Sequence, residues 1–120
     1  MRRAEVYLVE MVQAAQRIAS YIEGMSRTDF LADHKTRAAV VREIEIIGEA
    51  ARQIPEGLRA SHPEVRWAEL ARLRNLYIHA YHAVDYTLVW RTATATIPRV
   101  AAAVGSIALP DNTVSDSADQ

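Results

Sequence analysis

The chain has 120 residues, 50% of them hydrophobic, and a formal charge of -1, which suits one folded domain with one core. It contains no cysteine, so disulfides, thiolate zinc sites and cysteine nucleophiles are excluded and the fold must depend on packing. The near-neutral charge argues against a protein that coats nucleic acid through bulk electrostatics, although a local basic pocket stays compatible with it.

The first expected helix spans residues 4–24, because its apolar residues recur at three- and four-residue steps. Gly24 is well placed to end it. Ser26 is followed three positions later by Asp29, as in a capping box, so we expect a short helical turn through Leu31. The apolar stripe of the first helix consists of Leu8, Met11, Val12, Ala15, Ile18, Ala19 and Ile22.

A second long helix is expected over residues 35–53. Gly48 lies on its apolar stripe, which suggests that two helix backbones approach closely there. Glu43, Glu45 and Glu49 could be taken for a carboxylate site, but their helical spacing among arginines favours a solvated, ion-paired face. The prolines and glycine that follow predict a connection over residues 55–65 with at most a short turn.

A third long helix begins at Trp67 and ends near Tyr81. Asp85 can cap a fourth helix, within which Pro98 should cause a kink or a split near Ile97. After Gly105 the periodicity is lost, so we expect a domain over residues 1–105 and a polar, disordered tail over residues 106–120.

These elements predict an all-α fold, an antiparallel bundle of four main helices with one short extra helical turn. The chain has no strand-like alternation, internal repeat or glycine-rich phosphate loop. It also has no apolar run long enough to span a bilayer and no apolar block after its first residues. We therefore expect a cytoplasmic protein with no membrane partner.

The third helix carries polar residues where a packed helix would have apolar ones, in the segment RNLYIHAY. At 100° per residue, Arg74 shares a stripe with Tyr81, whereas Asn75 and His79 share a neighbouring stripe. Arg74 and His79 are therefore separated by about 140°. Either the long arginine reaches round, or the helix end is distorted, or a second copy of the helix supplies the missing partner across a two-fold axis.

Chemically, His79 could transfer a proton near neutral pH and Arg74 could hold a phosphate or the charge on a phosphorane, with Asn75 orienting either one. Such a group would suit metal-independent RNA cleavage. On spacing alone such residues are more often surface or hydrogen-bonded structural groups. A zinc pair of His79 with His82 is a further alternative, without an evident third ligand.

The segment LRNLYIHAYHAVDYTLVW resembles the HepT-like toxins of the HEPN superfamily, whose signature is Arg-x-x-x-x-His-x-Tyr. The matching residues are Arg74, Asn75, His79, Tyr81, Val84, Asp85 and Trp90. Upstream, the segment EIIGEA, the Pro-Glu turn and the tryptophan before the signature helix are also similar, so that the resemblance covers roughly residues 5–104. His82, where this family more often has an aromatic or apolar residue, is a departure.

The resemblance implies a HEPN bundle that forms a homodimer, with signature residues of both subunits facing one cleft. It implies a metal-independent ribonuclease without a cofactor, the toxin of a type II toxin-antitoxin pair, acting on tRNA or mRNA. Arg74 and His79 would be catalytic and Asn75 supporting. The antitoxin would be a minimal nucleotidyltransferase that transfers AMP to Tyr81, blocking RNA by charge and bulk.

Because the chain is nearly neutral, RNA affinity must come from a local cleft, with Arg72 and Arg91 beside Arg74 as candidates.

An alternative function is a non-catalytic helical partner, or a nucleotide- or substrate-binding subunit, of a nucleotidyltransferase. A purely structural dimerisation module is a third. Tyr77, Tyr81 and Tyr86 are most simply core or interface aromatics.

Overall fold

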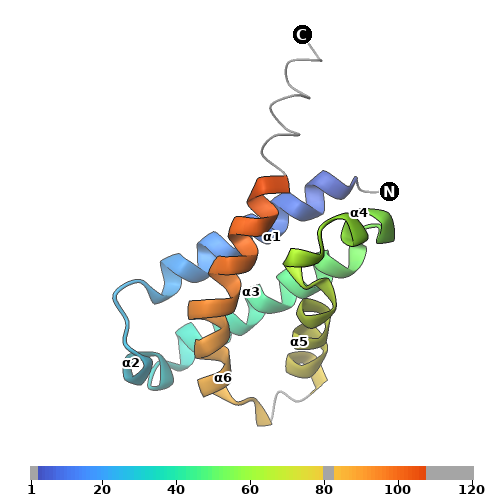
Figure 1. The fold of residues 1–120 in the computed structure, drawn as a ribbon. Helices are drawn as coiled ribbons and strands as arrows, with labels where there is room; N and C mark the ends of the chain where they lie inside the picture. The colour runs from blue at the N-terminus through green and yellow to red at the C-terminus, as the bar shows by residue number, and fades with distance from the viewer. Residues whose placement is uncertain (1–2, 80–82, 108–120) are drawn as a thin grey trace.

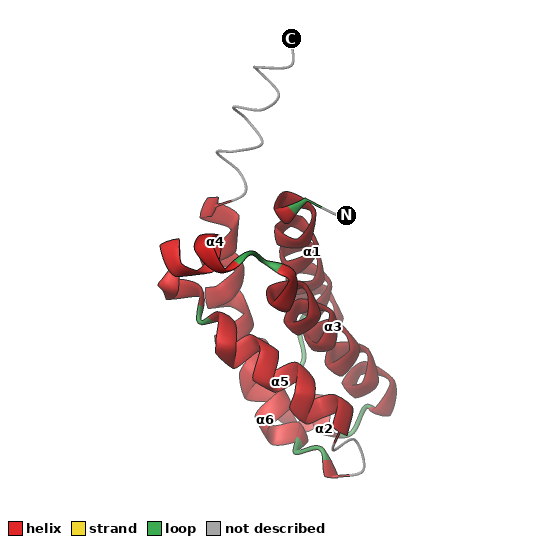
Figure 2. Ribbon diagram, turned by 90° about the vertical axis from the view of Figure 1, so that its right-hand side faces the viewer, coloured by secondary structure: helices red, strands yellow, loops and turns green. Residues whose placement is uncertain are grey.

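The computed structural model describes residues 3–79 and 83–107, and the regular elements of these residues are all helical (Figure 1, Figure 2). The predicted all-α bundle is therefore confirmed. The tail predicted to be disordered spans residues 106–120, and from residue 108 onward it lies outside the described residues. In chain order the elements are α1 (Ala4–Ile22), α2 (Arg27–Leu31), α3 (His34–Gln53), α4 (Glu56–Ser61), the 3-10 turn η1 (Pro63–Val65), α5 (Trp67–His79), α6 (Tyr86–Arg91) and the π-helical turn η3 (Thr92–Thr96), which continues as helix over residues 97–107.

Helix α3 is the centre of the bundle, with α1 packed along one side and α5 along another (Figure 1). The continuous helix from α6 to residue 107 contacts α1, α2 and α3. The side chains between these helices form one core, in which Leu8, Ile44 and Tyr77 are almost fully buried. Among the described residues, no helix combines the length and the apolar content that crossing a bilayer requires.

The turn between α1 and α3 forms as the sequence predicts. Gly24 adopts a φ of 78°, a left-handed conformation that favours glycine, directly after α1. Ser26 and Asp29 form a complete capping box, with Ser26 Oγ accepting from the Asp29 amide at 3.1 Å and Asp29 Oδ2 accepting from the Ser26 amide at 3.0 Å. These contacts start α2 and direct the chain back along α1.

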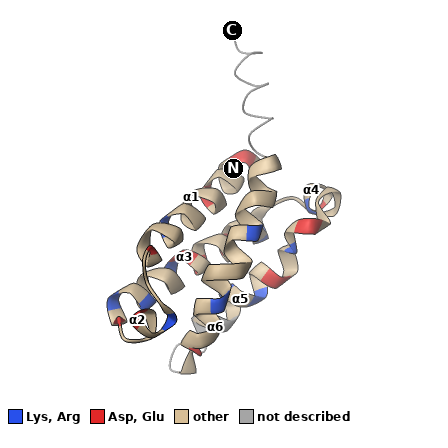
Figure 3. Cartoon of the chain, turned by 60° about the vertical axis from the view of Figure 1, so that its left-hand side comes forward, with Lys and Arg blue, Asp and Glu red and all other residues tan. Residues whose placement is uncertain are grey.

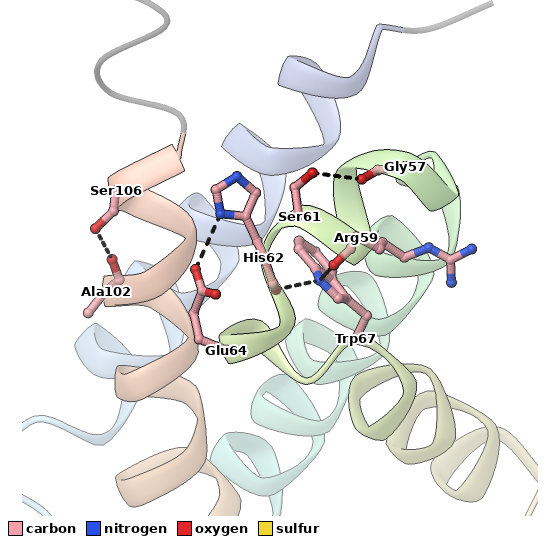
Figure 4. A network of polar contacts seen from close by, with 8 residues as sticks. All are labelled: Gly57, Arg59, Ser61, His62, Glu64, Trp67, Ala102 and Ser106. Atoms are coloured by element: carbon pink, nitrogen blue, oxygen red, sulfur yellow. Dashed lines mark hydrogen bonds and ion pairs between the residues drawn. The ribbon is translucent and has the colours of Figure 1, made fainter.

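The connection before α5 has more structure than predicted, because it contains both α4 and η1. Pro55 directly precedes α4, a place where its missing N–H costs nothing. The indole N–H of Trp67 is shared between two backbone carbonyl oxygens of this connection, at 3.1 Å from Arg59 and 2.9 Å from His62 (Figure 4). The buried Trp67 thereby fixes the connection to the first residue of α5.

The last helix confirms the predicted cap at Asp85, whose Oδ1 accepts hydrogen bonds from the amides of Thr87 and Leu88 at 3.0 and 3.3 Å. The interruption predicted near Ile97 takes the form of the π-helical turn η3, which ends one residue before it. Pro98 has no N–H to donate to the preceding turn, so regular α-helical bonding cannot pass through it unchanged. Helix then continues two residues beyond the predicted boundary at Gly105.

Helices α3 and α5 touch at Gly48, as the glycine on the apolar stripe predicts. A β-carbon at this position would overlap the β-carbon of Arg74 and would lie 2.7 Å from the carbonyl oxygen of Leu70. A real side chain here must therefore push α5 away from α3. On α5, this contact lies at Arg74, the arginine of the signature.

We expect Gly48→Ala to lower the free energy of unfolding by about 1–3 kcal/mol, because the added methyl group meets the β-carbon of Arg74 and the carbonyl oxygen of Leu70, neither of which can move away without a shift of α5. Gly105→Ala is the matched control, since its β-carbon would meet nothing within 4 Å; it should raise stability by roughly 0.5 kcal/mol through helix propensity. Urea unfolding followed by circular dichroism measures both. Equal effects of the two substitutions would contradict the close contact.

Candidate active site

Helix α5 distributes its polar residues over different environments. Tyr77 is buried, Asn75 is exposed, and the side chain of Arg74 is 24% exposed. His79 is the last residue of the helix, and its side chain lies outside the described part of the structure. Tyr81 and His82, the predicted modification site and the second histidine, also fall outside the described residues.

The guanidinium of Arg74 is held on two sides. Its Nη1 donates a hydrogen bond of 2.9 Å to Asn75 Oδ1 on the same helix. Its Nη2 lies 3.3 Å from Glu49 Oε1 on α3, an ion pair between the two helices. The structure thus brings the predicted supporting residue Asn75 into contact with Arg74, and adds Glu49, which the sequence did not single out for this role.

Arg74 lies at one edge of a groove of about 630 Å³ over the α1–α3 face. Its charged lining is balanced, with Glu10, Glu45 and Glu49 facing Arg17, Arg42 and Arg74. The other lining residues are Tyr7, Gln13, Ile46, Ala50 and Gln53. A guanidinium in such a surface is partly neutralised before any ligand arrives.

The prediction of a solvated glutamate face is wrong for Glu43, which is 7% exposed. Its Oε1 receives Arg17 Nε at 3.0 Å and Nη2 at 2.9 Å, and its Oε2 accepts from the Tyr21 hydroxyl at 2.9 Å. The hydrogen bond to this carboxylate raises the pKa of both Arg17 and Tyr21. Glu43 therefore joins α3 to α1 as a paired structural charge.

The two further RNA-binding candidates do not lie beside Arg74 in the groove. Arg72 and Arg91 are exposed, but neither lines it. Two residues along a helix correspond to about 200°, so Arg72 leaves α5 on nearly the opposite face from Arg74. Basic and acidic positions are interspersed along the helices (Figure 3), which fits the near-neutral composition.

Tyr77 is a core residue, as one reading of the sequence predicts, with 1% of its surface exposed. Burial raises the pKa of its phenol, and the neighbouring Thr92 offsets this only in part. Within the described residues its hydroxyl has no partner at hydrogen-bond geometry. These features make it a packing aromatic, and they place its hydroxyl away from the exposed side of α5.

Gly48 and Glu49 are the residues that sequence reasoning only partly identified. Gly48 was noticed for close packing, but not for contact with Arg74, and Glu49 was assigned to a solvated face. The available signal was the segment EIIGEA, which resembles the family upstream of the signature. Among the described residues, no group of three or more potential metal ligands comes together, and the zinc alternative at His79 and His82 involves side chains outside them.

Comparison with known proteins fits this arrangement. The model of the family described as "Ribonuclease HepT-like" matches residues 11–107, which include all of α3 and α5. The chain belongs to the HepT-like ribonuclease family. The match covers the core helices as well as the signature, so membership in the HepT-like family does not depend on the short motif alone.

Several curated proteins are similar to this HepT-like chain. A protein of Thermococcus cleftensis named "Probable ribonuclease HepT" is 42% identical over 77% of this chain and 84% of its own length. A protein of Caldanaerobacter subterraneus, provisionally named an RNase, is 35% identical over 83% of this chain and 89% of its own length. A protein of Methanocaldococcus jannaschii, also provisionally named an RNase, is 32% identical over 82% of this chain and 91% of its own length. No solved structure matches the chain significantly.

Proposed function

We propose that this protein is a metal-independent endoribonuclease, the toxin of a type II toxin-antitoxin pair. The observation that carries the proposal is membership in the HepT-like ribonuclease family over the helix that holds Arg74, Asn75 and His79. The partly exposed, hydrogen-bonded guanidinium of Arg74 supports it, since such a group can receive a phosphate. Its RNA substrate would be a tRNA or an mRNA.

In the proposed reaction, His79 removes the proton from a ribose 2′-hydroxyl, and the 2′-oxygen attacks the adjacent phosphorus. Arg74 stabilises the negative charge that grows on the phosphoryl oxygens, and Asn75 keeps the guanidinium in place. The bond from phosphorus to the 5′-oxygen breaks, and that oxygen takes up a proton. The products are a 2′,3′-cyclic phosphate and a 5′-hydroxyl, and the steps require no metal ion.

The direction of Arg74 supports a site shared between two copies of the chain. Its guanidinium extends towards α3, where Glu49 holds it, and ideal helix geometry places the His79 position about 140° away. Reaching round α5 towards the His79 position would draw Nη2 of Arg74 away from Glu49 on α3. In a symmetric dimer, Arg74 of one subunit could face His79 of the other without that cost.

Wild-type protein should cleave tRNA in the presence of EDTA and leave 2′,3′-cyclic phosphate ends. His79→Ala should reduce the rate roughly 10²–10⁴-fold and Arg74→Ala roughly 10²–10³-fold, because these substitutions remove proton transfer and charge stabilisation. Cleavage is measured on end-labelled RNA, and Arg72→Ala tests the predicted RNA contact of Arg72, which lies outside the groove. Equal background cleavage by wild type and His79→Ala would overturn the proposal and favour a non-catalytic partner of a nucleotidyltransferase.

A shared site predicts that two inactive chains restore each other. When Arg74→Ala and His79→Ala chains are co-expressed with different tags, random pairing makes half of the dimers mixed, each with one intact site out of two, so about a quarter of wild-type activity should return. Purified single-variant dimers are the controls. A mixed dimer that stays inactive while wild type cleaves RNA would contradict a site built from both chains.

For inhibition, we propose that a cognate minimal nucleotidyltransferase antitoxin transfers AMP to the phenol of Tyr81. The added phosphate charge and adenosine bulk beside the proposed catalytic pair would block RNA electrostatically and sterically.

After co-expression with such a partner, intact mass spectrometry should show additions of the mass of AMP that vanish in Tyr81→Phe. Tyr77→Phe is the matched control, since Tyr77 is buried and should accept no AMP. An unmodified wild-type chain, or additions that persist in Tyr81→Phe, would contradict the assignment.

A further inference from the structure

We propose that Glu49 is a positioning residue for Arg74: its carboxylate sets the guanidinium in the orientation in which it receives the RNA phosphate. The inference rests on the proposed ribonuclease function and adds a residue that lies outside the signature. The observation behind it is the ion pair of 3.3 Å between Glu49 Oε1 and Arg74 Nη2, formed between α3 and α5.

The carboxylate of Glu49 is itself held in place from the next turn of α3. Gln53 Nε2 donates to its Oε2 at 3.1 Å, and Arg52 Nη1 lies 3.4 Å from its Oε1. Both partners come from the i+3 and i+4 positions, which face the same side of the helix. Glu49 therefore offers Oε1 to Arg74 from a fixed position, although the side chain is 45% exposed.

The stem of Arg74 is constrained from the same side. Its β-carbon packs on the backbone of Gly48, where no side chain intervenes, so the first atoms of the arginine are fixed by the contact of the two helices. Asn75 then receives Nη1 and Glu49 receives Nη2. The adjacent residues Gly48 and Glu49 of α3 thus fix the two ends of the Arg74 side chain: Gly48 its β-carbon and Glu49 its guanidinium.

This arrangement leaves donors for a substrate. A guanidinium has five N–H groups, and the two contacts made with described residues use one from each terminal nitrogen. The Nε–H and the second hydrogens of Nη1 and Nη2 remain for phosphoryl oxygens, so RNA can bind while Glu49 and Asn75 stay in contact. Arg74 would then be oriented before the substrate arrives, which is how a fixed dipole or charge contributes most to catalysis.

Because Glu49 is negatively charged, its removal should affect the orientation of Arg74 and the attraction of the RNA phosphate in opposite ways. A carboxylate beside the site repels the phosphate, so its removal should not weaken RNA binding, whereas the loss of orientation should slow the chemical step. We therefore expect Glu49→Ala to lower kcat roughly ten- to a hundredfold and to leave KM unchanged or reduced. Glu49→Gln keeps an acceptor oxygen in nearly the same position and should retain more of kcat than Glu49→Ala.

Glu45→Ala is the matched control, because Glu45 lies one turn earlier on the same groove, carries the same charge and contacts Arg42 at 3.5 Å instead of Arg74. The decisive test measures cleavage by Glu49→Ala in an Arg74→Lys background. A residue that acts through Arg74 should cost little more once the guanidinium is gone, whereas general damage to the fold would reduce the rate by the same factor in both backgrounds.

The inference is overturned if Glu49→Ala cleaves RNA like wild type, or if its cost is the same in both backgrounds. Thermal unfolding checks that each variant is folded, and Glu49→Gln carries the same double-variant comparison if the alanine chain does not fold. If wild-type protein leaves RNA intact, the proposed function falls and this inference falls with it. An active wild type with a fully active Glu49→Ala removes only the inference.

Discussion

The close contact between α3 and α5 at Gly48 is the constraint on which the rest of this site depends. Because position 48 has no side chain, the two backbones approach until the β-carbon of Arg74 rests on α3. The same approach brings the next residue, Glu49, within ion-pair distance of the guanidinium. The packing of the core and the geometry of the signature arginine are therefore one feature, and neither can change without the other.

Charge pairing between helices holds individual arginines in defined orientations in this nearly neutral protein. Glu43 neutralises Arg17 between α1 and α3, and Glu49 partly neutralises Arg74 between α3 and α5. A partly exposed pair such as Glu49 with Arg74 contributes little to stability, about 0–1 kcal/mol. The effect of such pairs is on geometry, since each fixes a long side chain that would otherwise sample many rotamers. Binding would then depend on a few oriented donors and not on the overall field of the protein.

Local patterns in the sequence predicted most of the fold. Period-3.6 stripes located the long helices, Ser26 and Asp85 marked the caps of α2 and α6, and Gly48 marked the close approach. The short helix α4 was missed because prolines and a glycine in a short segment also suit an irregular connection. Glu43 was misplaced because helical spacing among arginines looks the same whether the charge faces water or is buried against another helix.

The partnership of Glu49 with Arg74 could not be derived from spacing, since 25 residues separate them and only the packing of α3 on α5 brings them together. This ion pair bears on the question that the sequence left open, namely how Arg74 could meet His79. A free arginine could have been imagined reaching round α5 to His79, which would make the site complete in one chain. Instead, Glu49 holds one terminal nitrogen of Arg74 against α3, and Asn75 on α5 accepts a hydrogen bond from the other. The proposed site shared between two copies would leave the ion pair of Arg74 with Glu49 intact, whereas a site within one chain would have to break it.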